Sequence, residues 1–215
     1  MVEDKALVVS GAPLEQARAA VILVHGRGAT ARSMIPLAEE IGLPGVAYLA
    51  PQAPGNIWYP YSLLAPLEQN EPRLSRALQT LADLFERVEA ANIPAARTLL
   101  LGFSQGASLS LEFTARNPRA FGGVVGLSGA LIGPPGMPRA YPGSLAGAEV
   151  FLGCSDVDPF IPLERVRETE RVLRGMGAQV TARIYPGMDH TVNEDELATV
   201  RDMVERLLAK QITKG

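Results

Sequence analysis

Short apolar runs alternate along the chain with longer stretches in which apolar residues recur every three or four positions. The apolar runs lie near residues 7–9, 19–24, 46–50, 98–101, 123–127, 150–152 and 180–184. Runs that are apolar throughout are typical of strands covered on both faces of a parallel sheet. The periodic stretches predict amphipathic helices near residues 30–41, 72–91, 104–116, 162–174 and 193–208. The last of these is expected to begin with a capping box of Asn193 and Glu196 and to bury Leu197, Val200, Val204 and Leu208.

This alternation of strands and helices predicts an α/β fold, with a mostly parallel central sheet and helices on both faces. The length of 215 residues suits a single domain over residues 1–215. The Gly- and Pro-rich stretch over residues 132–143 is expected to be a loop, because strand patterns continue on both sides of it. In such sheets active sites gather at the carboxyl ends of the strands, so we expect functional side chains in the segments that follow them.

Charge and composition narrow the classes of function. The net charge of −3 is spread along the chain without a basic run, so nucleic acid is not an expected partner. No segment approaches the ~20 apolar residues of a membrane span, and the charged N-terminus does not resemble a signal peptide. A single cysteine, Cys154, excludes an internal disulfide, which favours a reducing, cytoplasmic location.

Ser104 stands at the centre of a G-x-S-x-G pentapeptide, Gly102-Phe103-Ser104-Gln105-Gly106. The pentapeptide directly follows a predicted strand and opens a predicted helix. A serine on so sharp a turn needs strained backbone angles, and glycine on both sides leaves room for it. This context predicts a serine hydroxyl presented at the top of the sheet.

A serine hydroxyl is a poor nucleophile unless a base and an orienting acid accompany it. His190, in the loop after the last strand, is the expected base, and Asp158, after the preceding strand, is its expected partner. The order Ser104, Asp158, His190 is that of the α/β-hydrolase fold. Asp156 is an alternative to Asp158 as the orienting acid. Asp189, which immediately precedes His190 in the sequence, is a less favoured alternative.

Backbone N–H groups that stabilise an oxyanion are expected from Gln105, which follows the serine, and from Arg27, which lies between two glycines after an early strand. His25, at the end of that strand, is expected to bond the loop backbone rather than to catalyse. Two separated histidines and one cysteine make no ligand cluster, so neither a metal nor a cofactor is expected.

The substrate pocket is expected to have Trp58 and Leu63 on one wall and Phe160 and Met188 on the other, an arrangement suited to an apolar acyl or aryl group. The alternative is that these side chains pack the core. The side chain of Arg27 also has two interpretations. It binds an anionic group of the substrate, or it points to water or pairs with a nearby group of the protein.

Five segments together resemble the phospholipase/carboxylesterase family, which includes small carboxylesterases and acyl-protein thioesterases. They are residues 25–28 (HGRG), residues 102–106 (GFSQG), residues 127–129 (LSG), residues 158–162 (DPFIP) and residues 189–190 (DH). The resemblance implies a triad of Ser104, Asp158 and His190, with an oxyanion hole from the amides of Arg27 and Gln105. Family members usually carry an apolar residue where Arg27 stands.

These observations predict a serine carboxylesterase that cleaves small-molecule esters with small to medium acyl groups. A lysophospholipase or an acyl-protein thioesterase acting on long chains is the alternative of the same class. A non-catalytic binding protein on a hydrolase fold is the alternative of another class. A homodimer is possible.

Overall fold

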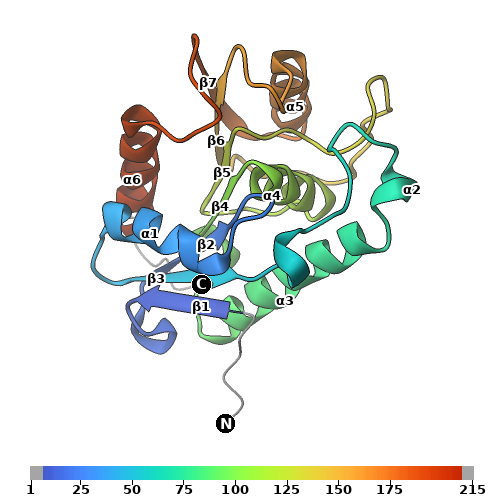
Figure 1. The fold of residues 1–215 in the computed structure, drawn as a ribbon. Helices are drawn as coiled ribbons and strands as arrows, with labels where there is room; N and C mark the ends of the chain where they lie inside the picture. Colours follow the sequence, from blue (N-terminus) through green and yellow to red (C-terminus); the bar gives the residue numbers. More distant parts are fainter. Residues whose placement is uncertain (1–6, 210–215) are drawn as a thin grey trace.

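A seven-stranded sheet organises the computed structural model, which describes residues 7–209 (Figure 1). The strand order is β1-β3-β2-β4-β5-β6-β7. Strands β2 to β7 are parallel, and β1 pairs antiparallel with β3 at one edge. The strands are β1 (Leu7–Gly11), β2 (Ala19–Val24), β3 (Val46–Pro51), β4 (Thr98–Phe103), β5 (Gly123–Leu127), β6 (Glu149–Ser155) and β7 (Gln179–Tyr185).

Helices cover both faces of the sheet, as Figure 1 shows. Helices α1 (Ile35–Ile41) and α6 (Glu194–Ala209) pack on one face, while α3 (Arg73–Ala90), α4 (Gln105–Arg116) and α5 (Leu163–Gly175) pack on the other. The short α2 (Leu67–Asn70) precedes α3. The predicted α/β fold class is therefore confirmed. Within residues 7–209, none of the helices is both long and apolar enough to cross a lipid bilayer.

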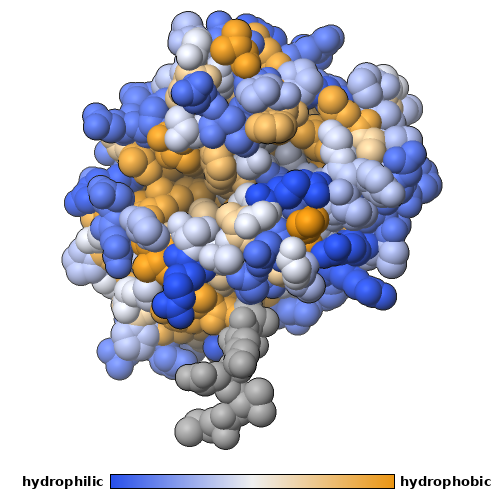
Figure 2. Space-filling model, in the orientation of Figure 1, coloured by the Kyte–Doolittle hydropathy of each residue, from blue (hydrophilic) through white to orange (hydrophobic). Residues whose placement is uncertain are grey.

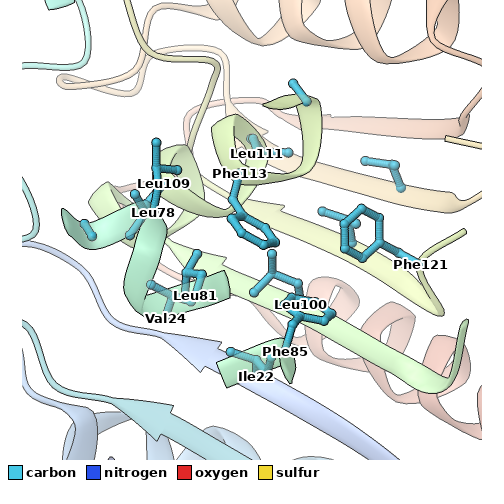
Figure 3. Packing of buried hydrophobic residues seen from close by; sticks show 14 of the residues in the cluster. Ile22, Val24, Leu78, Leu81, Phe85, Leu100, Leu109, Leu111, Phe113 and Phe121 are labelled. Carbon is cyan, nitrogen blue, oxygen red and sulfur yellow. The ribbon is translucent and has the colours of Figure 1, made fainter. Parts of the chain in front are cut away.

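Three phenylalanines pack together within the mainly aliphatic core beneath α3 and α4 (Figure 3). Phe85 of α3 stacks on Phe113 of α4 with ring centroids 5.4 Å apart, and Phe121 meets Phe85 edge-on at 5.4 Å. Leu100 of β4 lies in the same cluster. Truncating such a buried ring costs about 3–5 kcal/mol. This packing anchors α4, the helix that follows the candidate serine.

The helix predicted over residues 30–41 is divided in two. Thr30 caps a 3-10 turn, Ala31–Met34, by accepting a hydrogen bond from the Ser33 N–H, and α1 begins only at Ile35. Pro36 lies in the first turn of α1 and has no N–H, so it cannot continue an α-helical ladder from the preceding turn.

Helix α6 buries a face that differs from the expected one. Val200 and Val204 are buried as predicted, but Leu197 and Leu208 are only partly buried. Glu196 is fully buried instead. It forms the predicted capping box with Asn193: its Oε2 accepts the Asn193 N–H at 2.9 Å, and its own N–H donates to the Asn193 side chain at 2.9 Å. Because the Glu196 carboxylate bends back to bond the Asn193 N–H, its side chain occupies the buried face of α6.

None of residues 132–143, the Gly- and Pro-rich loop, lines the pocket described below. Two buried charged side chains hold its start. Glu112 Oε2 accepts the Ile132 N–H at 3.1 Å, and Arg165 Nη2 donates to the Leu131 and Gly133 carbonyls at 2.8 and 3.0 Å. The loop is thus a structural connection.

Candidate active site

Ser104 occupies a sharp turn between β4 and α4. Its φ of 55° and ψ of −120° are unusual for a residue with a side chain, and its N–H donates to the Leu127 carbonyl at 2.9 Å. Only glycine fits at the flanking positions. A Cβ on Gly102 would lie 2.2 Å from the Gly106 oxygen, and one on Gly106 would lie 2.1 Å from the Val24 oxygen. The turn therefore depends on close backbone packing.

His190 lies in the loop between β7 and α6, and it bridges two side chains from distant parts of the sequence. Its Nε2 is 2.9 Å from Ser104 Oγ, and its Nδ1 is 2.7 Å from Asp158 Oδ2. The ring lies between Phe103 and Phe160, with centroid distances of 5.1 and 4.9 Å. These aromatic contacts restrict the orientation of the imidazole.

Asp158 follows β6, and its side chain is inaccessible to solvent. Burial alone would raise the pKa of this carboxyl, but hydrogen bonds from His190 and from the Phe160 and Ile161 amides outweigh it and lower the pKa. The carboxylate accepts from His190 Nδ1–H, so Nε2 has a free lone pair toward Ser104 Oγ. An imidazole in this tautomer can accept the serine proton.

The two rival acids lie elsewhere. Asp156 Oδ1 accepts the Gly187 N–H at 2.8 Å, which ties the segment after β6 to the loop that carries His190. The backbone carbonyl of Asp189 accepts the Thr191 N–H at 2.8 Å, and the two ring nitrogens of His190 bond Asp158 and Ser104 instead of its carboxylate. The structure thus brings Asp158, and neither neighbour, to the ring.

Arg27 and Gln105, the two residues expected to supply oxyanion amides, line the same pocket as Ser104. Gln105 is the first residue of α4, where an N–H has no partner within the helix, and the helix dipole there favours negative charge. Gly26 lies against the serine, because a Cβ built there would be 3.3 Å from Ser104 Cβ. Gly28 has a φ of +77° and its N–H donates to the Asn56 carbonyl at 2.8 Å. Neither the Arg27 nor the Gln105 N–H has an acceptor within the described residues.

A pocket of about 680 Å³ opens beside Ser104 and His190. Of the four residues expected to form it, Leu63 and Phe160 line it. The lining is completed by Gly26, Arg27, Ala29, Tyr59, Pro60, Tyr61, Ser62, Leu64, Phe103, Gln105, Ser108, Pro159, Ile161 and Pro162. Figure 2 shows that apolar groups also reach the surface on one face of the molecule, between more numerous polar ones.

Trp58 and Met188 do not line the pocket, contrary to expectation. Trp58 is 2% exposed, and its indole Nε1–H donates to the His25 carbonyl at 2.8 Å behind the pocket wall. The sulfur of Met188 accepts a hydrogen bond from the Asn193 side chain near the start of α6. In both cases a local polar contact directs the side chain away from the pocket.

Two side chains fix the pocket wall in a way that the sequence did not reveal. Gln105 is buried, and its amide group accepts the Trp58 N–H at 2.9 Å and donates to the Tyr59 carbonyl at 2.7 Å. Arg27 donates to three consecutive carbonyls, Nη2 to Tyr59 at 2.9 Å and to Tyr61 at 2.7 Å, and Nη1 to Pro60 at 2.9 Å. A long polar residue directly after the serine was a signal for such a bond, since a buried amide needs partners.

The remaining candidates for chemistry are structural. His25 is fully buried, donates from Nδ1 to the Gly26 carbonyl at 2.8 Å and accepts the Ala53 N–H at Nε2. Burial lowers its pKa, which keeps the ring neutral. Burial also raises the pKa of the Cys154 thiol to about 12, so it stays protonated. Within residues 7–209, no three His, Cys, Asp or Glu side chains gather as metal ligands would.

A mostly parallel sheet, a serine on a strand-to-helix turn, and a carboxylate and an imidazole from later loops define an α/β-hydrolase. The sequence profile of the phospholipase/carboxylesterase family matches residues 4–208, and the chain belongs to that family. Membership makes it a carboxylic ester hydrolase, in agreement with the relatives it matches.

Among curated relatives, acyl-protein thioesterase 1 of Debaryomyces hansenii is 28% identical over 93% of this chain and 95% of its own length. Its counterpart in Candida albicans is 27% identical, over 90% and 94%. Among solved structures, a phospholipase/carboxylesterase from Dyadobacter fermentans is 40% identical with a TM-score of 0.89, covering 94% of this chain and 97% of that one. A Bacillus cereus carboxylesterase at 18% identity shares the fold, with a TM-score of 0.76 over 94% of this chain and 93% of that one.

Proposed function

We propose that this chain is a serine carboxylesterase that cleaves esters of small to medium acyl groups through an acyl-enzyme on Ser104. The observation that carries the proposal is the continuous pair of hydrogen bonds from Asp158 through His190 to the Ser104 hydroxyl, at 2.7 and 2.9 Å. This geometry lets one imidazole serve as base and then as acid.

In the first half of the reaction, Ser104 Oγ attacks the ester carbonyl carbon while His190 Nε2 takes the hydroxyl proton. Asp158 stays ionised and stabilises the imidazolium through Nδ1–H, a role that suits its lowered pKa. The carbonyl oxygen becomes an oxyanion within reach of the Arg27 and Gln105 amides. Each such donor contributes about 3–4 kcal/mol to lowering the barrier. The imidazolium then gives its proton to the leaving alcohol.

In the second half, His190 takes a proton from a water molecule as that water attacks the acyl carbon. The same two amides bind the second oxyanion. Collapse of the intermediate returns the proton to Ser104 Oγ and releases the carboxylic acid. The sequence of steps consumes one water per ester and leaves the enzyme unchanged.

The pocket supports a preference for small to medium groups. Its volume of about 680 Å³ falls within the range of roughly 300–1,000 Å³ that accommodates small organic ligands. Leu63, Leu64, Phe160 and Ile161 give it apolar walls beside the serine. An apolar acyl or aryl group therefore gains by leaving water there.

The test measures hydrolysis of 4-nitrophenyl butyrate together with covalent labelling by an alkyl fluorophosphonate, located by peptide mass spectrometry. We expect the label on Ser104, and we expect Ser104→Ala to lose both labelling and at least about a thousandfold of the turnover. The matched control is Ser110→Ala, because Ser110 is a buried serine of α4 that does not line the pocket. Folded wild-type protein with neither turnover nor label would favour a non-catalytic binding protein instead.

A thioesterase is the second candidate, supported by the curated relatives named acyl-protein thioesterase 1. The same nucleophile, base and oxyanion donors serve an oxygen ester and a thioester alike. Matched ethyl esters and ethyl thioesters of acyl chains from four to sixteen carbons separate the candidates. A maximum of kcat/KM at short oxygen esters supports the carboxylesterase, whereas a maximum at long thioesters supports the thioesterase.

A further inference from the structure

The pocket carries one fixed charge. Of the described residues that line it, Arg27 alone has a side chain that is permanently charged, and no Asp or Glu lines it. The chain as a whole has a net charge of −3. A cation at the wall of an otherwise uncharged pocket in an acidic protein creates a local positive potential where the substrate binds.

The charge of Arg27 is not neutralised within the described part of the chain. Its three acceptors are the Tyr59, Pro60 and Tyr61 carbonyls, which are neutral. Arg183 shows the contrast, since its Nη1 lies 2.8 Å from the Asp195 carboxylate. Hydrogen bonds to carbonyls therefore fix the Arg27 guanidinium in place and leave its charge available to a ligand.

Arg27 also keeps donors for that ligand. A guanidinium has five N–H groups, and the three carbonyls occupy three of them. Nε–H and one Nη1–H have no acceptor among the described residues. Because the group is already held, it loses little conformational freedom when it binds an anion.

The position of Arg27 relative to the reacting bond follows from its own backbone. Gly26, the preceding residue, lies against Ser104, and the Arg27 side chain lines the same pocket. The guanidinium bonds the carbonyls of Tyr59, Pro60 and Tyr61, which line the same pocket as Ser104. A substrate that lies along this wall can therefore present an anionic group to Arg27 while its carbonyl lies at Ser104.

Resting on the serine esterase function proposed above, we propose that the preferred substrates are esters that carry a carboxylate a few bonds from the scissile carbonyl, and that Arg27 selects them. The carboxylate pairs with the guanidinium while the apolar walls hold the intervening methylene groups. A charged hydrogen-bonded pair of this kind is worth about a tenfold to hundredfold in kcat/KM.

The test uses two matched pairs of substrates followed by acid release. Monoethyl glutarate is compared with ethyl pentanoate, which places the carboxylate on the acyl side. The acetate ester of 4-hydroxybutanoate is compared with butyl acetate, which places it on the alcohol side. The readout is the ratio of kcat/KM for the anionic ester to that for its neutral partner, and we expect a ratio of about ten or more in at least one pair.

We expect Arg27→Gln to lower that ratio about tenfold to hundredfold. The variant also loses the bonds to the Tyr59, Pro60 and Tyr61 carbonyls, but a change in the wall affects both esters of a pair, so it cancels in the ratio. The matched control is Arg73→Gln. Arg73 also donates to carbonyls of this segment, those of Pro54 and Ile57 at 2.7 and 2.6 Å, but it does not line the pocket. Its substitution should change the ratio less than about twofold.

Salt gives a readout that needs no variant. The ratio of the wild-type enzyme should fall as NaCl rises from 0.02 to 0.5 M, because Arg27 is exposed and its attraction is screened. A kcat/KM ratio that does not change with salt, or that Arg27→Gln leaves unchanged, overturns this inference. Turnover of the neutral esters in the same experiment would still support the proposed esterase function. Equal losses for both members of each pair would make Arg27 a purely structural residue. Absence of turnover for every ester would overturn the proposed esterase itself.

Discussion

The turn at Ser104 and the pocket wall over residues 57–64 face the same cavity but are built differently. The turn is fixed by backbone: two parallel strands, the start of α4 and two glycines that admit no side chain. The wall has no helix or strand, and side chains from other segments hold its backbone. Gln105, Arg27 and Asn70 supply these bonds. The reaction geometry thus depends on the fold, whereas the shape of the pocket depends on individual side chains.

The largest expected effect lies on the backbone-fixed side. Asp158→Asn should lower kcat about ten-thousandfold, because an amide can hold the imidazole in the wrong tautomer and cannot stabilise its charged form. Asp156→Asn is the matched control and should cost less than about tenfold, since Asp156 only bonds the Gly187 N–H. Steady-state kinetics on one neutral ester measures both. Similar losses in the two variants would contradict the assignment of Asp158.

A smaller effect is expected where the wall depends on one side chain. Gln105→Met removes the bonds to the Trp58 N–H and the Tyr59 carbonyl but retains the backbone amide. The two backbone groups lose partners, at about 1–3 kcal/mol each. We expect KM to rise about tenfold with a smaller change in kcat, and amide exchange at Trp58 to accelerate.

The control for the wall is Gln79→Met, an exposed glutamine on α3 that bonds only Asp83 nearby. It should leave KM and exchange unchanged. If Gln105→Met lowers kcat strongly at constant KM, the wall and the reacting groups are coupled, and the distinction between the two regions fails.

The smallest effect concerns stability under α6. Burial raises the pKa of Glu196 to about 7 from an ordinary value of 4.5, with Asp195 adding to the shift and the Asn193 N–H opposing it. The folded state therefore holds this proton more tightly than the unfolded state, so the free energy of unfolding falls as the pH rises from about 4.5 to 7 and then levels. Glu196→Gln should remove about 1–3 kcal/mol of this pH dependence.

Urea unfolding at pH 5, 6, 7 and 8 gives the free energy of unfolding of the wild type and of Glu196→Gln. The effect is the change with pH in the difference between these two free energies. Glu194→Gln is the control, because Glu194 begins the same helix but is exposed. If the free energies of unfolding of wild type and Glu196→Gln change with pH in parallel, the pKa of the Glu196 carboxyl is not raised by folding.

Much of the fold could be predicted because each element is periodic and locally encoded. The run over residues 19–24 coincides with β2. The strand predicted near residues 98–101 is β4, which ends two residues later, at Phe103. The geometry of Ser104, Asp158 and His190 followed from strand ends that meet at one edge of the sheet. Choosing Asp158 over Asp156 depended on the resemblance, because both residues follow the same strand and loop order does not separate them.

The pocket wall could not be predicted in the same way. Its shape depends on bonds from side chains to carbonyls more than thirty residues away, such as those of Arg27, and periodicity carries no information about them. Trp58 was therefore expected in the pocket, although its indole N–H finds an acceptor behind the wall. At α6 the capping box was recognisable, but its consequence, a buried Glu196 in place of Leu197, opposed the apolar pattern.

Position 27 joins two separable roles in one residue. The amide N–H proposed to bind the oxyanion is common to every amino acid except proline, whereas the guanidinium against the wall is peculiar to arginine. If Arg27 selects the substrate as proposed, replacing its side chain during evolution alters which esters bind and leaves the backbone amide in place. Related esterases with different substrate preferences can in this way arise from single codon changes at position 27.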